Sequence, residues 1–174
     1  MTELEAIRTF FRFNSRVRRK YLRTLLNLPP EERLKDRGAS FPSLQEIYVH
    51  TLDGLHEWLE YAPQDRFEEA EPLPARELTE EQLVEETEKV DSIASDYLAR
   101  LNEADLEKEM VIHFTVNGTR VAERFPIGDI LWHVVEEELQ HRGELNALLW
   151  QMDVDPPLGR VEDWNAAKDR SSKR

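Results

Sequence analysis

Cysteine is absent from the 174-residue chain. Without thiols the protein has no disulfides, no thiolate metal ligands and no cysteine nucleophile. Side chains that bind a metal must then be histidine, aspartate or glutamate. The chain also lacks an N-terminal basic region followed by an apolar run, and it lacks any uncharged apolar stretch of about 18 residues. We therefore expect a cytoplasmic protein.

Basic residues are scarce as well: 23 Lys and Arg stand against 36 Asp and Glu, which gives a net charge of −13. This charge opposes contact with phosphate backbones and anionic lipids, so we expect neither nucleic acid nor membrane partners. The length fits one domain, because single cores commonly span roughly 100 to 200 residues. We expect a single domain over residues 1–174, with a tail from about residue 157 that is only partly ordered.

Four long segments have apolar residues at helical spacing, over residues 4–26, 44–61, 79–101 and 126–150. Ser43 is a good N-cap for the second segment, a capping box opens the third, and a proline suits the first turn of the fourth. The chain therefore predicts four helices, with no alternating strand pattern between them.

A different pattern precedes the last helix. Over residues 110–125, β-branched and aromatic residues flank Asn117-Gly118, a dipeptide that suits a two-residue turn with positive φ. The sequence thus predicts an all-α protein, a four-helix bundle with a short β-hairpin before the last long helix. The interior of such a bundle is available for a ligand or a metal site.

The last predicted helix carries ionisable side chains on its apolar face. Its apolar stripe runs through Ile130 and Val134 and resumes at Leu145, and Glu137 and His141 continue the stripe between them. An unpaired carboxylate in a packed interior costs several kcal/mol, so it must be paired, protonated or coordinated. Residues four apart lie on one helix face, which lets these two side chains converge on one cation.

A third ligand must come from another helix. His50, at the edge of the apolar face of the second helix, is the best donor, and Gly54 one turn later leaves room. The residues leave a second interpretation open, in which Glu137 is partly solvated and His141 is a hydrogen-bonded core histidine. His133, one turn before Glu137, is expected to pack or to donate a hydrogen bond to a ligand, with replacement of a ligand as the alternative.

Two other histidine motifs are set aside. His56 and Glu60 lie away from the apolar face of their helix, so we expect them to be solvated. Glu138 and His141 spell one Glu-x-x-His motif, whereas di-iron bundles need two such motifs and two further glutamates. His113, in the predicted hairpin, is assigned no role.

Two segments resemble the signature segments of the DinB/YfiT-like metalloprotein superfamily. They are SLQEIYVHTLD at residues 43–53 and ILWHVVEEELQHRGEL at residues 130–145. Residues 11–14 and 28–32 also resemble its first helix and the following loop, so the resemblance spans about residues 11–157. In that family a histidine on the second helix joins two residues four apart on the last helix.

The resemblance implies one divalent metal ion, zinc or nickel, held by His50, Glu137 and His141. Many members have a third histidine in place of Glu137, but some, including the mycothiol-dependent maleylpyruvate isomerases, similarly use a His-Glu-His set. The glutamate adds a negative charge, which should weaken the metal as a Lewis acid.

Characterised members are transferases or isomerases that use low-molecular-weight thiols. The resemblance therefore implies a metal-dependent transferase in which a metal-bound thiolate attacks a small-molecule electrophile. A non-catalytic metal-binding or interaction protein of a stress response and a metal-dependent hydrolase are the alternatives. Members are often homodimers, and we expect a homodimer here. No catalytic residue is assigned from the sequence.

Overall fold

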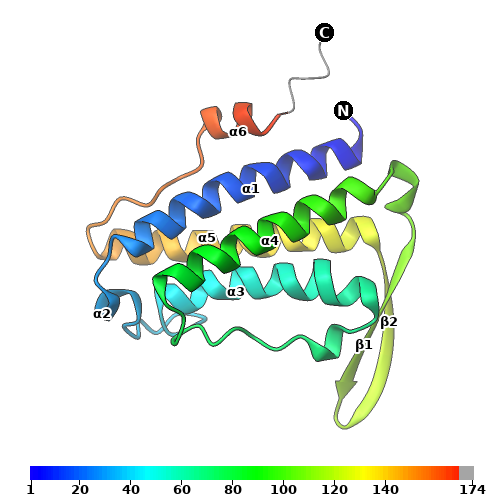
Figure 1. Ribbon diagram of the computed structural model, residues 1–174, viewed down its shortest axis with the longest axis horizontal. Coiled ribbons are helices and arrows are strands. Elements are labelled where there is room, and N and C mark those ends of the chain that lie inside the picture. The colour runs from blue at the N-terminus through cyan, green and yellow to red at the C-terminus, as the bar shows by residue number, and fades with distance from the viewer. Residues whose placement is uncertain (169–174) are drawn as a thin grey trace.

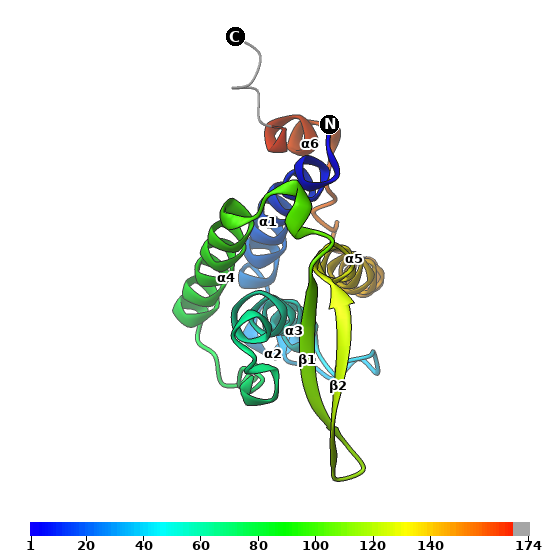
Figure 2. The same ribbon diagram turned by 90° about the vertical axis from the view of Figure 1, so that its right-hand side faces the viewer.

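The computed structural model describes residues 1–168. This part of the chain is mostly helical, and its four long helices lie side by side around a shared core (Figures 1 and 2). These helices are α1 (Glu3–Leu26), α3 (Leu44–His56), α4 (Glu80–Arg100) and α5 (Ile127–Gln151). The shorter elements are α2 (Pro30–Arg33), a π-helical turn η1 (Glu57–Tyr61), the 3-10 turns η2 (Ala62–Gln64), η3 (Phe67–Glu69) and η4 (Glu103–Asp105), the strands β1 (Glu109–Val116) and β2 (Thr119–Pro126), and α6 (Val161–Ala167).

Side-chain caps define where three of the long helices begin. Thr2 and Thr79 form capping boxes at the starts of α1 and α4, and the Ser43 hydroxyl accepts a hydrogen bond from the Glu46 backbone N–H at the start of α3. The predicted helix boundaries are therefore confirmed within a few residues. Pro126 is the last residue of β2 and directly precedes the first residue of α5, rather than lying within its first turn.

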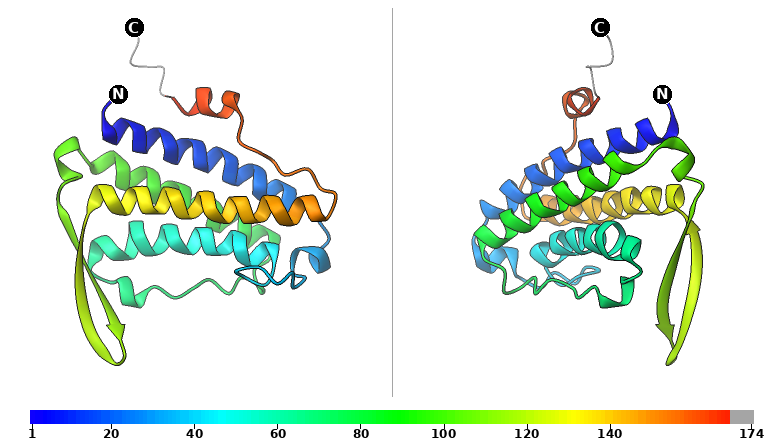
Figure 3. Two further views of the ribbon diagram at one scale, coloured as in Figure 1. Left: turned by 180° about the vertical axis from the view of Figure 1, so that it is seen from behind. Right: turned by 45° about the vertical axis from the view of Figure 1, so that its right-hand side comes forward.

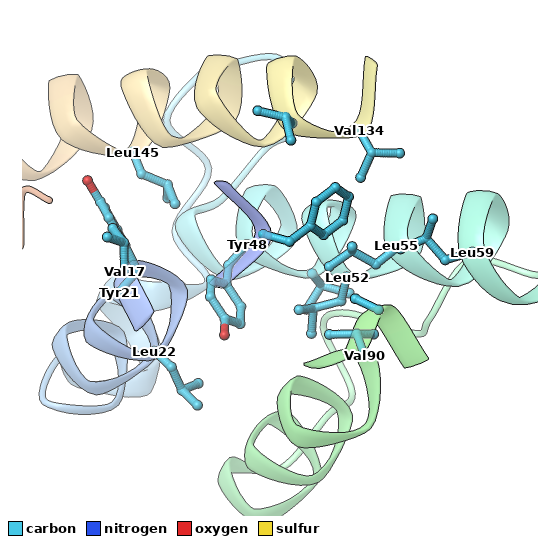
Figure 4. Packing of buried hydrophobic residues seen from close by; sticks show 14 of the residues in the cluster. Val17, Tyr21, Leu22, Tyr48, Leu52, Leu55, Leu59, Val90, Val134 and Leu145 are labelled. Carbon is cyan, nitrogen blue, oxygen red and sulfur yellow. The ribbon is translucent and has the colours of Figure 1, made fainter. Parts of the chain in front are cut away.

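The core is formed by the apolar faces of the four long helices. Figure 4 shows Leu52 and Leu55 of α3 between Val90 of α4 and Val134 of α5, and Tyr48 of the same helix further toward α1. All five side chains are buried. At roughly 1.5 to 3 kcal/mol for each large apolar side chain buried, this packing is the main stabilising contribution to the fold.

The two strands form an antiparallel hairpin in which Val116 pairs with Thr119. Asn117 and Gly118 both have positive φ, 50° and 77°, as the predicted two-residue turn requires. The hairpin runs across one end of the long helices and projects beyond α3 (Figures 1 and 3). The prediction of a helical fold with a hairpin before the last long helix is thus confirmed.

Helix α6, which the sequence did not predict, lies against α1 (Figure 2). The Trp164 ring packs edge-on against Phe10 and Phe13, with ring centroids 4.7 Å and 5.1 Å apart. The Lys20 ammonium donates to Asp163 at 2.5 Å. These contacts hold residues 161–167 on the outer side of α1. None of the helices within residues 1–168 is long and apolar enough to cross a membrane.

Candidate metal centre

His50, Glu137 and His141 come together between α3 and α5. Each offers one ligand atom, and no two of these atoms are more than 4.8 Å apart. His50 Nε2 lies 3.4 Å from Glu137 Oε1, and the His50 and His141 rings meet nearly perpendicularly, with centroids 4.7 Å apart. The structure therefore brings together the three residues that the sequence singles out, and this group could hold a metal ion.

The separations fit a small divalent ion. Nitrogen and oxygen ligands bind zinc at about 2.0 to 2.2 Å, so two ligand atoms at a tetrahedral ion lie roughly 3.4 Å apart. His50 Nε2 and Glu137 Oε1 already have this separation. No separation in the group exceeds 4.8 Å, so a small rotation of a side chain would bring the more distant ligand atoms to the tetrahedral spacing.

Gly54 makes the approach of Glu137 possible. A Cβ atom at residue 54 would lie 3.4 Å from Glu137 Oε2, so any side chain larger than alanine would occupy the space of the carboxylate. Gly54 is buried and lies one turn after His50 on the same helix. The prediction that this glycine leaves room for the site is confirmed.

His141 is oriented by a neighbouring carboxylate that the sequence analysis did not identify. His141 Nδ1 lies 3.3 Å from Glu144 Oε2. Glu144 in turn accepts hydrogen bonds from the Ser40 backbone N–H at 2.7 Å and from the Ser40 hydroxyl at 2.6 Å. A neutral His141 that donates its Nδ1–H to Glu144 keeps Nε2 free for a cation, which is the usual arrangement around metal-binding histidines.

The same loop supports His50. The Phe41 ring stacks on the His50 ring, with centroids 4.1 Å apart and an interplanar angle of 28°, and it meets His141 edge-on at 5.8 Å. Ser40 and Phe41, adjacent in the segment before α3, therefore position one ligand on α5 and one on α3. Nothing in the spacing of these residues predicts their contacts, because the path of the loop is set by tertiary packing.

The charges at the site are coupled. The pKa of His50 is raised, chiefly by its contact with the Glu137 carboxylate and against the effect of partial burial. The pKa of Glu137 is lowered, chiefly by its contact with His50 and against the effect of burial. Two further carboxylates lie near His50, and burial raises the pKa of both Asp53 and Glu57. The surroundings are thus rich in negative charge, which favours a bound cation.

Glu144 differs from these carboxylates. Partial burial alone would raise its pKa, but the hydrogen bonds from Ser40 and His141 outweigh burial and lower it. Glu144 therefore remains an acceptor for the His141 N–H in mildly acidic solution.

His133 lies beside the group rather than in it. Its Nε2 is 3.8 Å from Glu137 Oε2, and half of its side chain is exposed to solvent. Its ring packs edge-on against Trp58, with centroids 5.5 Å apart. This position next to the second oxygen of Glu137 agrees with a supporting role, and the choice between that role and replacement of a ligand stays a prediction.

The most buried ionisable residues on α5 are Glu138 and Arg142, not Glu137 and His141. Glu138 receives two hydrogen bonds from Arg18 of α1, at 3.3 Å and 3.0 Å. The side chains of Glu137 and His141 are 27% and 12% exposed, against 8% for Glu138. The two residues that the sequence places on the apolar stripe, Glu137 and His141, therefore lie at its partly exposed edge, and Glu138 and Arg142 occupy the more buried face. Helix α5 faces α1 with one edge and α3 with the other, and the candidate ligands lie on the α3 edge.

The prediction that His56 is solvated was wrong. His56 is buried, with Nδ1 2.7 Å from Glu60 Oε2 and Nε2 3.2 Å from Glu86 Oε2 on α4. Helix α4 covers this side of α3, which the periodicity of α3 alone did not reveal. His113 contacts Asp65 at 2.6 Å and ties the hairpin to the segment after η2.

The comparison with known families agrees with this geometry. The model of the DinB family matches residues 1–166, nearly the whole chain. A comparison with curated proteins finds none that matches. Because the match includes all four long helices and the three candidate ligands, the fold and the site fall within it. The chain belongs to the DinB family.

Proposed function

We propose that the protein binds one divalent metal ion through His50, Glu137 and His141 and acts as a metal-dependent transferase with a low-molecular-weight thiol. The observation that carries the proposal is the convergence of these three ligand atoms within 4.8 Å of one another. Two imidazoles and one carboxylate suit zinc or nickel. We also propose that the four long helices form the four-helix bundle of the DinB-like fold.

Three protein ligands leave coordination positions for another molecule, and an open position distinguishes catalytic from structural sites. A bound divalent ion would lower the pKa of a coordinated thiol and so supply a thiolate nucleophile near neutral pH. The residues of the chain have three tasks. Glu137 contributes negative charge, Glu144 holds the His141 ring, and Phe41 stacks on the His50 ring and holds it in place.

A homodimer is also proposed. Trp132 of α5 is tied to α1, because its indole N–H donates to Glu3 at 2.8 Å and its ring packs against Phe10. Leu139 and Trp150 on α5 are more exposed, at 44% and 55%. Light scattering on wild type and on the double variant Leu139→Glu, Trp150→Glu tests whether this face joins two copies.

The test of function uses cobalt-substituted protein. Titration with 2-mercaptoethanol should produce a sulfur-to-cobalt charge-transfer band in wild type and none in His50→Ala or His141→Ala. Thiol-dependent consumption of an electrophile such as 1-chloro-2,4-dinitrobenzene should follow the same pattern. A metal-loaded protein that gives neither the band nor thiol-dependent turnover with any common thiol contradicts a thiol transferase and leaves a metal-binding or hydrolytic protein.

A further inference from the structure

A hollow of about 350 Å³ borders the candidate metal centre on the side of His50. Its walls include His50, Phe41 and Asp53, together with residues 72–77 of the connection between η3 and α4. His50 belongs both to the candidate ligand set and to this wall, so the hollow adjoins one of the three candidate ligands.

One part of the wall is electrically neutral. The Arg76 guanidinium donates to Glu46 Oε2 at 2.9 Å and to the Leu34 carbonyl at 3.1 Å. The Ser43 hydroxyl also donates to Glu46, at 2.6 Å. Arg76 is therefore committed to protein acceptors, and the only arginine in the wall does not offer a free charge to an anionic ligand.

Two other carboxylates lie in the wall, those of Asp53 and Glu77. Asp53 Oδ1 accepts the Leu73 backbone N–H at 2.9 Å, and among residues 1–168 no cationic side chain forms an ion pair with Asp53 or Glu77. Asp53 lies one turn from His50, and Glu57 lies one turn further along the same helical segment. The remaining wall is apolar, formed by Phe41 and residues 72–75.

The charges in this hollow discriminate between ligands. A ligand carboxylate or phosphate would meet the like charge of Asp53 and Glu77, whereas a protonated amine would meet opposite charge. The Phe41 ring adds a face against which an ammonium group or a short alkyl chain can pack. The volume admits a small molecule of a few carbon atoms beside the metal.

We propose that the hollow beside His50 selects metal-bound ligands that carry a protonated amine over those that carry a carboxylate, with Asp53 as the residue that recognises the charge. This inference rests on the proposed function, because it names the class of thiol or substrate that the same site accepts. It restricts that class to small aminothiols and amine-bearing electrophiles.

Three thiols of similar size, cysteamine, 2-mercaptoethanol and mercaptoacetate, are titrated into cobalt-substituted protein at one pH. The charge-transfer band gives the dissociation constant of each thiol. The quantity compared is the ratio of the dissociation constants of mercaptoacetate and cysteamine. The thiols differ in intrinsic acidity, so each variant is compared with wild type, which cancels that difference. Asp53→Asn should lower the ratio by about fivefold to tenfold, the effect of one nearby charge.

Glu77→Gln should lower the ratio less, by about twofold, because Glu77 is exposed at the rim. Glu88→Gln removes the same charge from the exposed face of α4, outside the hollow, and should leave the ratio unchanged. Because Glu77→Gln changes only an exposed side chain, it keeps the proposal testable if Asp53→Asn does not fold.

If the ratio of the two dissociation constants is the same in wild type, Asp53→Asn and Glu77→Gln, the proposed selectivity is wrong. The proposed thiol-dependent function is not contradicted by that result. Tighter binding of mercaptoacetate in wild type than in Asp53→Asn also overturns the selectivity. Absence of a band with all three thiols, in protein that binds cobalt stoichiometrically, overturns both this inference and the proposed thiol chemistry.

Discussion

Gly54 of α3 faces the Glu137 carboxylate of α5 so closely that a Cβ at residue 54 would lie 3.4 Å from Glu137 Oε2. This contact is of ordinary van der Waals length for a methyl group and leaves no space for more atoms. The candidate ligand from α5 reaches the histidine on α3 because the facing position has no side-chain atoms beyond the position of a Cβ.

Substitutions at Gly54 should separate helix stability from metal binding. Gly54→Ala should stabilise the fold by up to about 1 kcal/mol, because alanine favours the helix interior, and should change metal affinity less than about threefold. Gly54→Val should displace Glu137 and weaken metal binding by at least about tenfold. Competition with a chromophoric chelator measures the affinity, and circular dichroism confirms the helices. Wild-type affinity in Gly54→Val would show that Glu137 does not need this space.

Loss of the Glu144 carboxylate should weaken metal binding without removing a ligand. Glu144→Gln is expected to reduce affinity by about 10-fold to 100-fold, because the amide holds the His141 ring less firmly. Ser40→Ala should have a smaller effect in the same direction, since the Ser40 backbone N–H still donates to Glu144. The matched control is Glu136→Gln, on the exposed side of α5. Equal affinities for Glu144→Gln and the control would exclude an orienting role for Glu144.

Between about pH 5 and pH 8, metal affinity should rise while the contribution of the His50–Glu137 pair to the stability of the metal-free protein falls. The raised pKa of His50 means that its pairing with Glu137 stabilises the metal-free protein below the ordinary histidine pKa of 6.5 and is lost as the pH rises through the raised value. The lowered pKa of Glu137 keeps its charge available until the pH falls below the ordinary value of 4.5. Because the pair is partly exposed, its contribution should be below about 1 kcal/mol.

The measurement is denaturant unfolding of metal-free wild type and His50→Gln from pH 5 to pH 8. The difference in unfolding free energy should be largest near pH 5 and should shrink toward pH 8, while metal affinity increases over the same range. A difference that grows with pH would contradict the assignment of the His50 contact.

The adjacent residues Glu137 and Glu138 should behave differently. Glu138→Gln breaks a buried ion pair with Arg18 and should cost about 3 kcal/mol of unfolding free energy, toward the lower end for such pairs because Asp91 remains 2.8 Å from Arg18. Glu137→Gln should change the stability of the metal-free protein by less than about 1 kcal/mol but should abolish tight metal binding. Equal losses of stability in the two variants would contradict the division of α5 into an α1 edge and an α3 edge.

Local sequence signals account for most of the elements. Capping residues such as Thr2 and Thr79 act within a few residues of themselves, and Asn117-Gly118 suits the positive φ of a two-residue turn between strands. The boundaries of the long helices and the hairpin could therefore be predicted. Helix α6 could not, because its seven residues are held by the contacts of Trp164 with Phe10 and Phe13, which are distant in the sequence.

The candidate ligands could be predicted because the spacing of Glu137 and His141 and the sequence motif around His50 can be read directly from the chain. The burial of Glu138 and His56 could not, because helical periodicity describes one face of one helix and each residue contacts a second neighbouring helix. Glu144 lies three residues after His141, a spacing that permits contact. Its hydrogen bonds from Ser40 depend on the loop before α3, so its role emerges only from the structure.

Metal content tests the central claim most directly. Protein purified without an affinity tag, in wild type, His50→Ala, His141→Ala and the hairpin control His113→Ala, should be measured by elemental analysis before and after reconstitution with zinc and nickel. We predict close to one ion per chain in wild type and His113→Ala and almost none in the other two variants. No bound metal in reconstituted wild type, or full occupancy in both His50→Ala and His141→Ala, would contradict a metal centre at this site.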